Sequence, residues 1–144
     1  MKRRIAVRGI IQKDDGSLFC VRQRHQDGSV NSFWCTPGGG LDDNEELEAG
    51  LRRELTEETG VQPDIGKLLY IQQYHDKEYE FLEFFFEVLN PHNFEKIDLA
   101  ATSHGQVELV EYGFISPKSE DILPIFLRSV VPEPQVQLFN YLTN

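Results

Sequence analysis

The first part of this chain has the hydrophobic pattern of two paired strands. Ile5–Gln12 and Ser17–Arg24 are strand-like runs, although Arg8 interrupts the first of them. The intervening residues 13–16 end in an Asp-Gly pair, which is typical of a tight hairpin turn. We therefore expect a β-hairpin, followed by a polar loop over residues 25–32.

The clearest strand pattern lies in Phe81–Leu89. Glu83 and Glu87 mark one side of this alternating run, which predicts a strand whose other side is covered. The wholly apolar side consists of Leu82, Phe84, Phe86 and Val88.

The remaining segments are assigned by the same criteria. We expect strands over Ile65–Tyr74 and Val107–Ile115, with a long loop over residues 90–106. Because proline is favoured in the first turn of a helix, Pro124–Val131 and Pro134–Leu142 are predicted to be helices. The order of strands and helices indicates an α/β fold in which a mixed sheet lies between helices.

The middle of the chain predicts an amphipathic helix from about Glu46 to Thr59. Leu47, Leu51 and Leu55 recur at intervals of four residues and so share one face. Gly60 follows directly, and glycine is the usual residue at a helix C-cap. The helix should therefore pack its leucines against the sheet.

Three carboxylates are concentrated at the end of this helix. Glu54, Glu57 and Glu58 are spaced i, i+3 and i+4, so they project from one side of the last turns. This placement is unfavourable, because the residues repel one another and the C-terminal end of a helix carries partial negative charge. A bound divalent cation would relieve the repulsion, and Mg²⁺ prefers carboxylate oxygens. The alternative is a solvated acidic face paired with Arg52 and Arg53.

A stiff segment followed by three glycines precedes the helix, in the run Trp34-Cys35-Thr36-Pro37-Gly38-Gly39-Gly40. Proline fixes its own φ, and glycines allow a backbone to turn sharply and to approach a ligand closely. A simple turn is the alternative interpretation.

Composition restricts the classes of function. The 144 residues are 40% hydrophobic and 26% charged, which is ordinary for one globular domain over residues 1–144. A net charge of −10 disfavours binding to nucleic-acid polymers, which requires clustered Lys and Arg. The sequence contains neither a signal peptide pattern nor an apolar run long enough to span a membrane. With only Cys20 and Cys35, we expect a cytoplasmic protein without disulfides.

The segment from Gly39 to Val61 resembles the signature box of the Nudix (MutT-like) hydrolases, G-x5-E-x7-R-E-U-x-E-E-x-G-U, where U is aliphatic. The W-x-x-P-G-G entry to the box is present as well. One departure is Gly50, where the family usually has alanine. The resemblance implies the α/β/α sandwich of that family. The fixed letters of the box fall at Gly39, Glu45, Arg53, Glu54, Glu57, Glu58 and Gly60.

The resemblance also implies a chemistry: Mg²⁺-dependent attack of water on a pyrophosphate bond of a nucleoside diphosphate linked to another group, with Mn²⁺ as an alternative ion. It implies that Glu54, Glu57 and Glu58 bind metal and act in catalysis. The carbonyl of Gly38 is implied as a further metal ligand. Glu45 and Arg53 are implied to orient the glutamates, and a purely structural role for Arg53 is the alternative.

Outside the box, the resemblance implies weaker candidates for substrate binding. Arg24 matches an arginine that contacts phosphate in relatives, and either Glu108 or Glu111 matches a further glutamate. Plain surface charge explains these three residues as well.

The substrate and the assembly stay open at this stage. A (d)NTP-type nucleotide is the first expectation, and ADP-ribose, a nucleotide sugar or a dinucleoside polyphosphate is the alternative. A different class of function is a non-catalytic module that senses nucleotides. We expect a small-molecule partner, no membrane or nucleic-acid polymer, and a monomer or homodimer.

Overall fold

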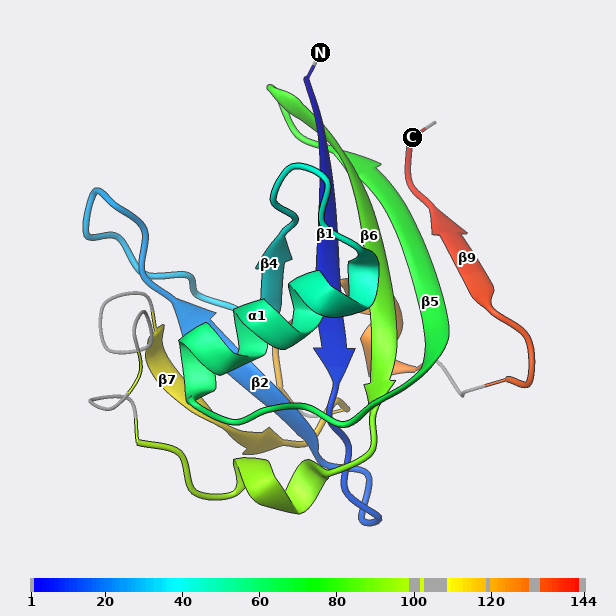
Figure 1. The fold of residues 1–144 in the computed structure, drawn as a ribbon. Coiled ribbons are helices and arrows are strands. Elements are labelled where there is room, and N and C mark those ends of the chain that lie inside the picture. Colours follow the sequence, from blue (N-terminus) through cyan, green and yellow to red (C-terminus); the bar gives the residue numbers. More distant parts are fainter. Residues whose placement is uncertain (1, 99–101, 103–108, 119, 130–132, 143–144) are drawn as a thin grey trace.

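The computed structural model describes residues 2–98, 102, 109–118, 120–129 and 133–142, and its architecture is shown in Figure 1. Two sheets and one α-helix dominate this part of the chain. The elements are β1 Lys2–Ile10, β2 Leu18–Gln23, β3 Trp34–Cys35, β4 Gly38–Gly40, α1 Leu47–Thr59, β5 Ile65–His75, β6 Tyr79–Val88, the 3₁₀ turn η1 Pro91–Phe94, β7 Leu109–Ile115, β8 Ile122–Leu123, the 3₁₀ turn η3 Ile125–Arg128 and β9 Gln137–Asn140.

The larger sheet is mixed and has the strand order β4-β1-β6-β5-β9. Its centre is the parallel pair β1 and β6, while β4 and β5 pair antiparallel to their neighbours and β9 pairs parallel to β5. The smaller sheet has the order β7-β2-β3-β8. The predicted strands are thus confirmed where the structure describes them, and Val107 and Glu108 lie outside the described residues.

Helix α1 crosses one face of the larger sheet and lies over β1 and β4 (Figure 1). It begins after Glu46 and ends at Gly60, which has the left-handed φ of 76° expected of a glycine C-cap. Both predicted bounds are confirmed. The leucines of the helix contribute to a core made of Val7, Ile11, Phe19, Val21, Leu51, Leu55, Phe86, Val88 and Phe94.

The opposite face of the larger sheet is also buried. Phe85 is fully buried there, so β6 is covered on both sides. Strand β8 and the turn η3 cover this face, and they supply Ile122, Phe126 and Leu127. The expected layered α/β sandwich is confirmed, with a 3₁₀ turn rather than an α-helix as the second cover within the described residues.

The two predicted C-terminal helices are wrong. Among the described residues of Pro124–Val131, the short turn Ile125–Arg128 forms in place of an α-helix, and residues 130 and 131 lie outside the described residues. Arg128 donates hydrogen bonds back to the carbonyl of Ile122 and to Asp121. Within Pro134–Leu142 the chain forms the strand β9, which pairs with β5. Long-range strand pairing has overridden the local proline signal.

The predicted loops are confirmed where the structure describes them, and residues 99–101 and 103–106 of the predicted loop over 90–106 lie outside the described residues. Residues 25–32 contain turns and one bridge, between Arg24 and Val30, and η1 forms a short turn within the loop that starts at residue 90. The glycine run differs from a simple turn, because Gly38–Gly40 forms strand β4 against β1. No helix in the described part of the chain has the length and hydrophobicity needed to cross a bilayer.

Gly38 packs closely against the backbone of β1, so we expect Gly38→Ala to destabilise the fold. A Cβ atom there would lie 2.0 Å from the carbonyl oxygen of Val7, and the φ of 144° is one that residues with side chains rarely adopt. We expect a loss of about 3 kcal/mol or more in the free energy of unfolding, and a melting temperature about 10 °C lower. Thermal and urea unfolding monitored by circular dichroism would measure this effect.

Gly16→Ala is the matched control. Gly16 also has positive φ, at 90°, but no atom lies within 4 Å of the added Cβ. We expect this variant to lose only about 1 kcal/mol. Equal losses in the two variants would show that φ, and not the contact with Val7, limits the position of Gly38.

Candidate active site

Arg53 connects the acidic groups on the outer side of α1. Its Nε and Nη2 atoms donate to the two carboxylate oxygens of Glu45 at 2.8 and 3.0 Å. Its Nη1 atom donates to Glu54 at 3.1 Å and to Glu57 at 3.2 Å, and Nη2 also donates to the carbonyl of Gly40 at 3.1 Å. One guanidinium therefore holds three carboxylates and the end of β4 together.

Glu45 lies just before the helix and is held from two sides. Besides the bidentate pair with Arg53, it accepts a hydrogen bond from the backbone N–H of Asp42 at 3.0 Å. The hydrogen bond from Arg53, followed by that from Asp42, lowers the pKa of Glu45 to about 2. Hydrogen bonding to Glu45 is in turn the largest influence that raises the pKa of Arg53. The two residues for which the resemblance implies an orienting role are therefore in direct contact.

Gly39 makes room for the carboxylate of Glu54. A Cβ atom built at Gly39 would lie 2.7 to 2.8 Å from all three atoms of that carboxyl group. The fixed glycine of the box is therefore explained by a contact, because any side chain here would displace Glu54. Strand β4 positions this glycine by pairing with Val7 of β1.

The glycine at position 50 has a local cause as well. A Cβ atom there would lie 2.3 Å from Cδ2 of Leu41 and 2.9 Å from Oε1 of Glu45. The helix thus approaches the preceding loop more closely than alanine allows. This packing offsets the loss of about 1 kcal/mol in helix propensity that glycine brings relative to alanine.

Glu58 lies one helical turn after Glu54 but is much more buried. Only 2% of the residue is exposed, at the side where α1 meets β1 and β4. Its negative charge contributes to the raised pKa of Arg8 and to that of Cys35. Glu54 and Glu57 therefore share Arg53, whereas the charge of Glu58 acts on Arg8 and Cys35.

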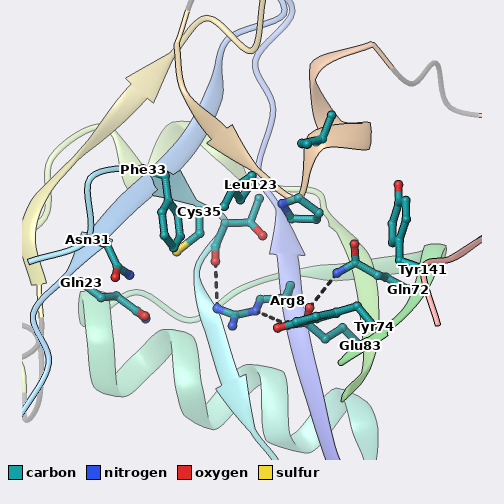
Figure 2. Close-up of a pocket in the computed structure, with 13 residues that line it drawn as sticks. Arg8, Gln23, Asn31, Phe33, Cys35, Gln72, Tyr74, Glu83, Leu123 and Tyr141 are labelled. Atoms are coloured by element: carbon teal, nitrogen blue, oxygen red, sulfur yellow. Dashed lines mark hydrogen bonds and ion pairs between the residues drawn. The ribbon is translucent and has the colours of Figure 1, made fainter. Parts of the chain in front are cut away.

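A cavity of about 430 Å³ opens on the other side of β1 and β6 (Figure 2). Its walls combine aromatic rings with amides and a few charged groups, which is typical of small-molecule sites. The hydroxyl of Thr36 in this wall is buried and has no hydrogen-bond partner among the described residues. The cavity is lined by Arg8, Gln23, Asn31, Phe33, Cys35, Thr36, Gln72, Tyr74, Glu83, Leu123, Pro124, Ile125 and Tyr141.

Arg8 and Glu83 form a largely buried ion pair in this cavity, with exposed side-chain fractions of 20% and 5%. The two residues are joined through Nε of Arg8 at 3.0 Å. Burial acts to lower the pKa of Arg8, but the charge and hydrogen bond of Glu83, together with Cys35 and the charge of Glu58, outweigh it, so the pKa is raised. Nη1 of Arg8 also donates to the carbonyls of Thr36 at 3.2 Å and Gly38 at 3.5 Å.

Sequence reasoning missed this ion pair. It treated Arg8 as an interruption of a strand and Glu83 as one of two residues that mark the second side of another strand. The signal was present, because a charged residue within each of two apolar strands is the pattern of a buried pair.

The weaker candidates lie away from the box glutamates. Arg24 is exposed at the end of β2, next to Gln23 in the cavity wall. Glu111 is half exposed and pairs with Arg22 at 2.9 Å. Glu108 lies outside the described residues. The described structure therefore brings neither Arg24 nor Glu111 into contact with Arg53 or its carboxylates.

The donor set fits a hard divalent cation by its chemistry. Glu54, Glu57 and Glu58 offer carboxylate oxygens and Gly38 offers a carbonyl oxygen, the groups that Mg²⁺ and Mn²⁺ take. In the described part of the chain, no three His, Cys, Asp or Glu side chains are grouped closely enough to hold an ion in their present positions. In this arrangement Glu54 and Glu57 contact Arg53 instead.

Comparison with known proteins identifies the family. The family model described as NUDIX domain matches residues 2–140, which is nearly the whole chain. The chain belongs to the Nudix family. The resemblance to the Nudix family inferred from the box is thereby confirmed.

Individual Nudix relatives match over shorter segments. A MutT-like protein of Streptomyces ambofaciens is 34% identical over 64 residues, which cover 44% of this chain and 38% of the relative. An RNA pyrophosphohydrolase of Haemophilus influenzae is 46% identical over 41 residues, or 28% of this chain and 21% of the relative. The matched segments thus span less than two fifths of these relatives' own lengths.

Solved structures support the Nudix fold. A MutT NUDIX hydrolase from Burkholderia pseudomallei superposes with a TM-score of 0.69 at 18% identity, covering 91% of this chain and all of the other. At this level of identity the likeness shows the fold alone.

The lowered pKa of Glu45 predicts that the free energy of unfolding decreases at acidic pH. Because this pKa is lowered to about 2 in the folded Nudix domain, the carboxylate stabilises the fold above pH 4.5, and the contribution is lost as the pH falls toward 2. We expect Glu45→Gln to lower the free energy of unfolding at pH 7 by about 1 kcal/mol, allowing for solvent screening. Urea unfolding at pH 7 and pH 2.5 should show the difference between the two proteins shrinking.

Glu46→Gln provides the control for this experiment. Glu46 is the neighbouring exposed glutamate at the helix N-cap, and its side chain makes no capping hydrogen bond. Its replacement should change stability less at both pH values. A deficit of Glu45→Gln that stays constant down to pH 2.5 would mean that Glu45 acts by packing rather than by charge.

Proposed function

We propose that this Nudix domain, residues 1–144, hydrolyses a pyrophosphate bond in a nucleoside diphosphate linked to another moiety, with Mg²⁺ as cofactor and a (d)NTP-type nucleotide as substrate. The observation that carries the proposal is the contact of Arg53 with Glu45, Glu54 and Glu57 beside the space left by Gly39. A cluster of carboxylates at a helix C-terminus is electrostatically unfavourable, so its presence here supports a role in binding a cation.

In this proposal Glu54, Glu57, Glu58 and the carbonyl of Gly38 would hold the ion. When bound, Mg²⁺ or Mn²⁺ would screen phosphate charge and lower the pKa of bound water. One of the box glutamates takes the proton from the attacking water as the bond within the pyrophosphate breaks. Arg53 acts by keeping the carboxylates in position, and Glu45 acts by fixing Arg53 through two hydrogen bonds.

The cavity beside Arg8 is the proposed site for the organic part of the substrate. A volume of about 430 Å³ suits one nucleoside, and Nη1 of Arg8 connects the cavity wall to the carbonyl of Gly38. Arg24, next to Gln23 in that wall, is proposed to contact phosphate at the open side. Glu111, or Glu108, is proposed as a further acidic contact.

The alternative substrates differ in the group that is linked to the nucleoside diphosphate. ADP-ribose, a nucleotide sugar or a dinucleoside polyphosphate shares the same pyrophosphate linkage. One relative is named RNA pyrophosphohydrolase, which adds the 5′ end of RNA to the substrates worth testing. The net charge of −10 argues against extended contacts with a polymer, so we favour a small nucleotide.

The proposal includes a cellular setting. Both cysteines are free, with Cys20 buried and Cys35 partly buried, as expected in a reducing cytoplasm. We propose a cytoplasmic monomer or homodimer that acts on a small molecule.

Glu57→Gln tests the catalytic proposal. We expect the wild type to release phosphate or pyrophosphate from at least one member of a nucleotide panel with Mg²⁺, and the variant to have a kcat lower by about 10² or more. Its melting temperature in metal-free buffer should stay within about 2 °C of the wild type, since it loses one of several carboxylates around Arg53.

Glu48→Gln is the control, because Glu48 is an exposed glutamate in the first turn of the same helix. It should keep wild-type activity. Equal turnover by the wild type and Glu57→Gln would remove the proposed mechanism. Nucleotide binding by the wild type without any turnover would instead identify a sensing module.

Gly39→Ala tests whether the position of the Glu54 carboxylate affects activity without affecting the stability of the fold. The added Cβ would displace the carboxyl group of Glu54, the flexible end of a side chain. We therefore expect activity to fall by about tenfold or more while the melting temperature changes little. Gly113→Ala, where nothing lies within 4 Å, is the control and should keep its activity. Unchanged turnover by Gly39→Ala would show that Glu54 need not sit against the backbone.

A further inference from the structure

One guanidinium contacts the segment that leads into strand β4. Nη1 of Arg8 donates to the carbonyl of Thr36 at 3.2 Å and to that of Gly38 at 3.5 Å. The carbonyl between them, that of Pro37, accepts a hydrogen bond from the backbone N–H of Gly9 at 3.0 Å. Three successive carbonyl oxygens are therefore bonded to two neighbouring residues of β1.

The segment is intrinsically flexible, so these bonds matter for its conformation. Strand β4 consists of the three glycines Gly38–Gly40 and lies at the edge of the larger sheet, where β1 is its neighbour. Glycine restricts the backbone less than any other residue. The direction of the Gly38 carbonyl therefore depends on contacts with β1 rather than on local preference.

Arg8 is itself fixed by a second pair of hydrogen bonds. One oxygen of Glu83 accepts from Nε of Arg8 at 3.0 Å, and the other accepts from the side-chain amide of Gln72 at 2.9 Å (Figure 2). The side chain of Glu83 is only 5% exposed, and both of its oxygens are engaged. A chain of hydrogen bonds therefore runs from β5 through β6 and β1 to the start of β4.

Glu83 also offsets the charge of Arg8. A lone guanidinium would repel a metal ion held nearby, whereas an ion pair carries no net charge. A carbonyl oxygen has two lone pairs, so Gly38 can accept from Arg8 and still bind a cation. The Arg8–Glu83 pair can therefore hold this carbonyl without opposing metal binding.

We propose that Arg8 is a positioning residue for the metal site, and that Glu83 and Gln72 keep it in place. Arg8 acts by fixing the carbonyl of Gly38. The inference rests on the proposed function, because that function assigns this carbonyl as a metal ligand. Arg8, Gln72 and Glu83 all lie outside the Nudix box.

The test replaces the ion pair by uncharged side chains. The double variant Arg8→Met/Glu83→Gln leaves no unpaired buried charge and keeps an acceptor for Gln72, so we expect it to fold, as circular dichroism would show. Mn²⁺ binding to the full chain is titrated without nucleotide, from the EPR signal of the free ion. We expect the dissociation constant to be about tenfold higher than that of the wild type, or more, because residues that orient metal ligands typically have effects of this size.

Arg3→Met/Glu80→Gln is the matched control. Arg3 and Glu80 also form an Arg–Glu pair between β1 and β6, at 2.6 Å. Arg3 is exposed, however, and it precedes the residues of β1 that pair with β4. This double variant should bind Mn²⁺ like the wild type.

A second measurement needs no metal. The heteronuclear ¹⁵N NOE values of the Gly38, Gly39 and Gly40 amides report fast motion of the backbone in β4. We expect lower values in Arg8→Met/Glu83→Gln and unchanged values in the control. Arg8→Lys should lower them as well, because lysine keeps the charge opposite Glu83 but lacks the planar group that reaches both Glu83 and the carbonyls. This single variant decides the matter if the double variant does not fold.

The outcomes distinguish the inference from the proposed function. Wild-type Mn²⁺ affinity in Arg8→Met/Glu83→Gln overturns the inference, and so does an equal loss of affinity in the control. Unchanged NOE values in the Arg8 variants overturn it whatever their affinity for the metal. Lower NOE values together with a wild type that binds no Mn²⁺ would overturn the proposed function but support the role of Arg8 in fixing Gly38.

Discussion

The arrangement of the glutamates on helix α1 depends on the guanidinium of Arg53. Arg53 donates to Glu45, Glu54, Glu57 and the carbonyl of Gly40, so it neutralises part of a charge cluster that would otherwise repel itself. A planar group with donors in fixed directions can do this, whereas the point charge of a lysine cannot reach four acceptors at once. The same contacts tie the helix to β4, so the electrostatic and the packing requirements of the site are met by one residue.

A second guanidinium connects the two faces of the larger sheet. Arg8 contacts Glu83 in the cavity and the carbonyl of Gly38 at β4, while the charge of Glu58 reaches it from the helix side. Arg8 therefore lies between the proposed metal ligands and the cavity proposed for the organic part of the substrate. A ligand that shifts Arg8 would also alter the surroundings of Gly38, which offers a short physical route between the cavity and the chemistry.

The sequence predicted those parts of the molecule whose signals are local. The leucine spacing and Gly60 defined the helix at both ends, and the box letters identified the carboxylates that Arg53 holds together. The C-terminal segment failed because Pro134 suggested a helix, whereas Gln137–Asn140 pairs with β5 and Phe139 stacks on Phe126 at a centroid distance of 4.0 Å. The Arg8–Glu83 pair was also missed, because each strand showed a charge among apolar residues but the two charges meet only through the pairing of β1 with β6.

The stability of the fold does not explain the Arg8–Glu83 pair. Removing two charges from water costs several kcal/mol per ion before their attraction is counted, and apolar replacements of such pairs are often neutral or stabilising. The surrounding cluster contains Phe85, Tyr70 and Phe126, so an apolar pair would have packed there readily. Glu83 also holds Gln72 in one orientation, which is a task that an apolar residue could not perform. The retained charge is therefore better explained by what the cavity recognises than by what holds the sheet together.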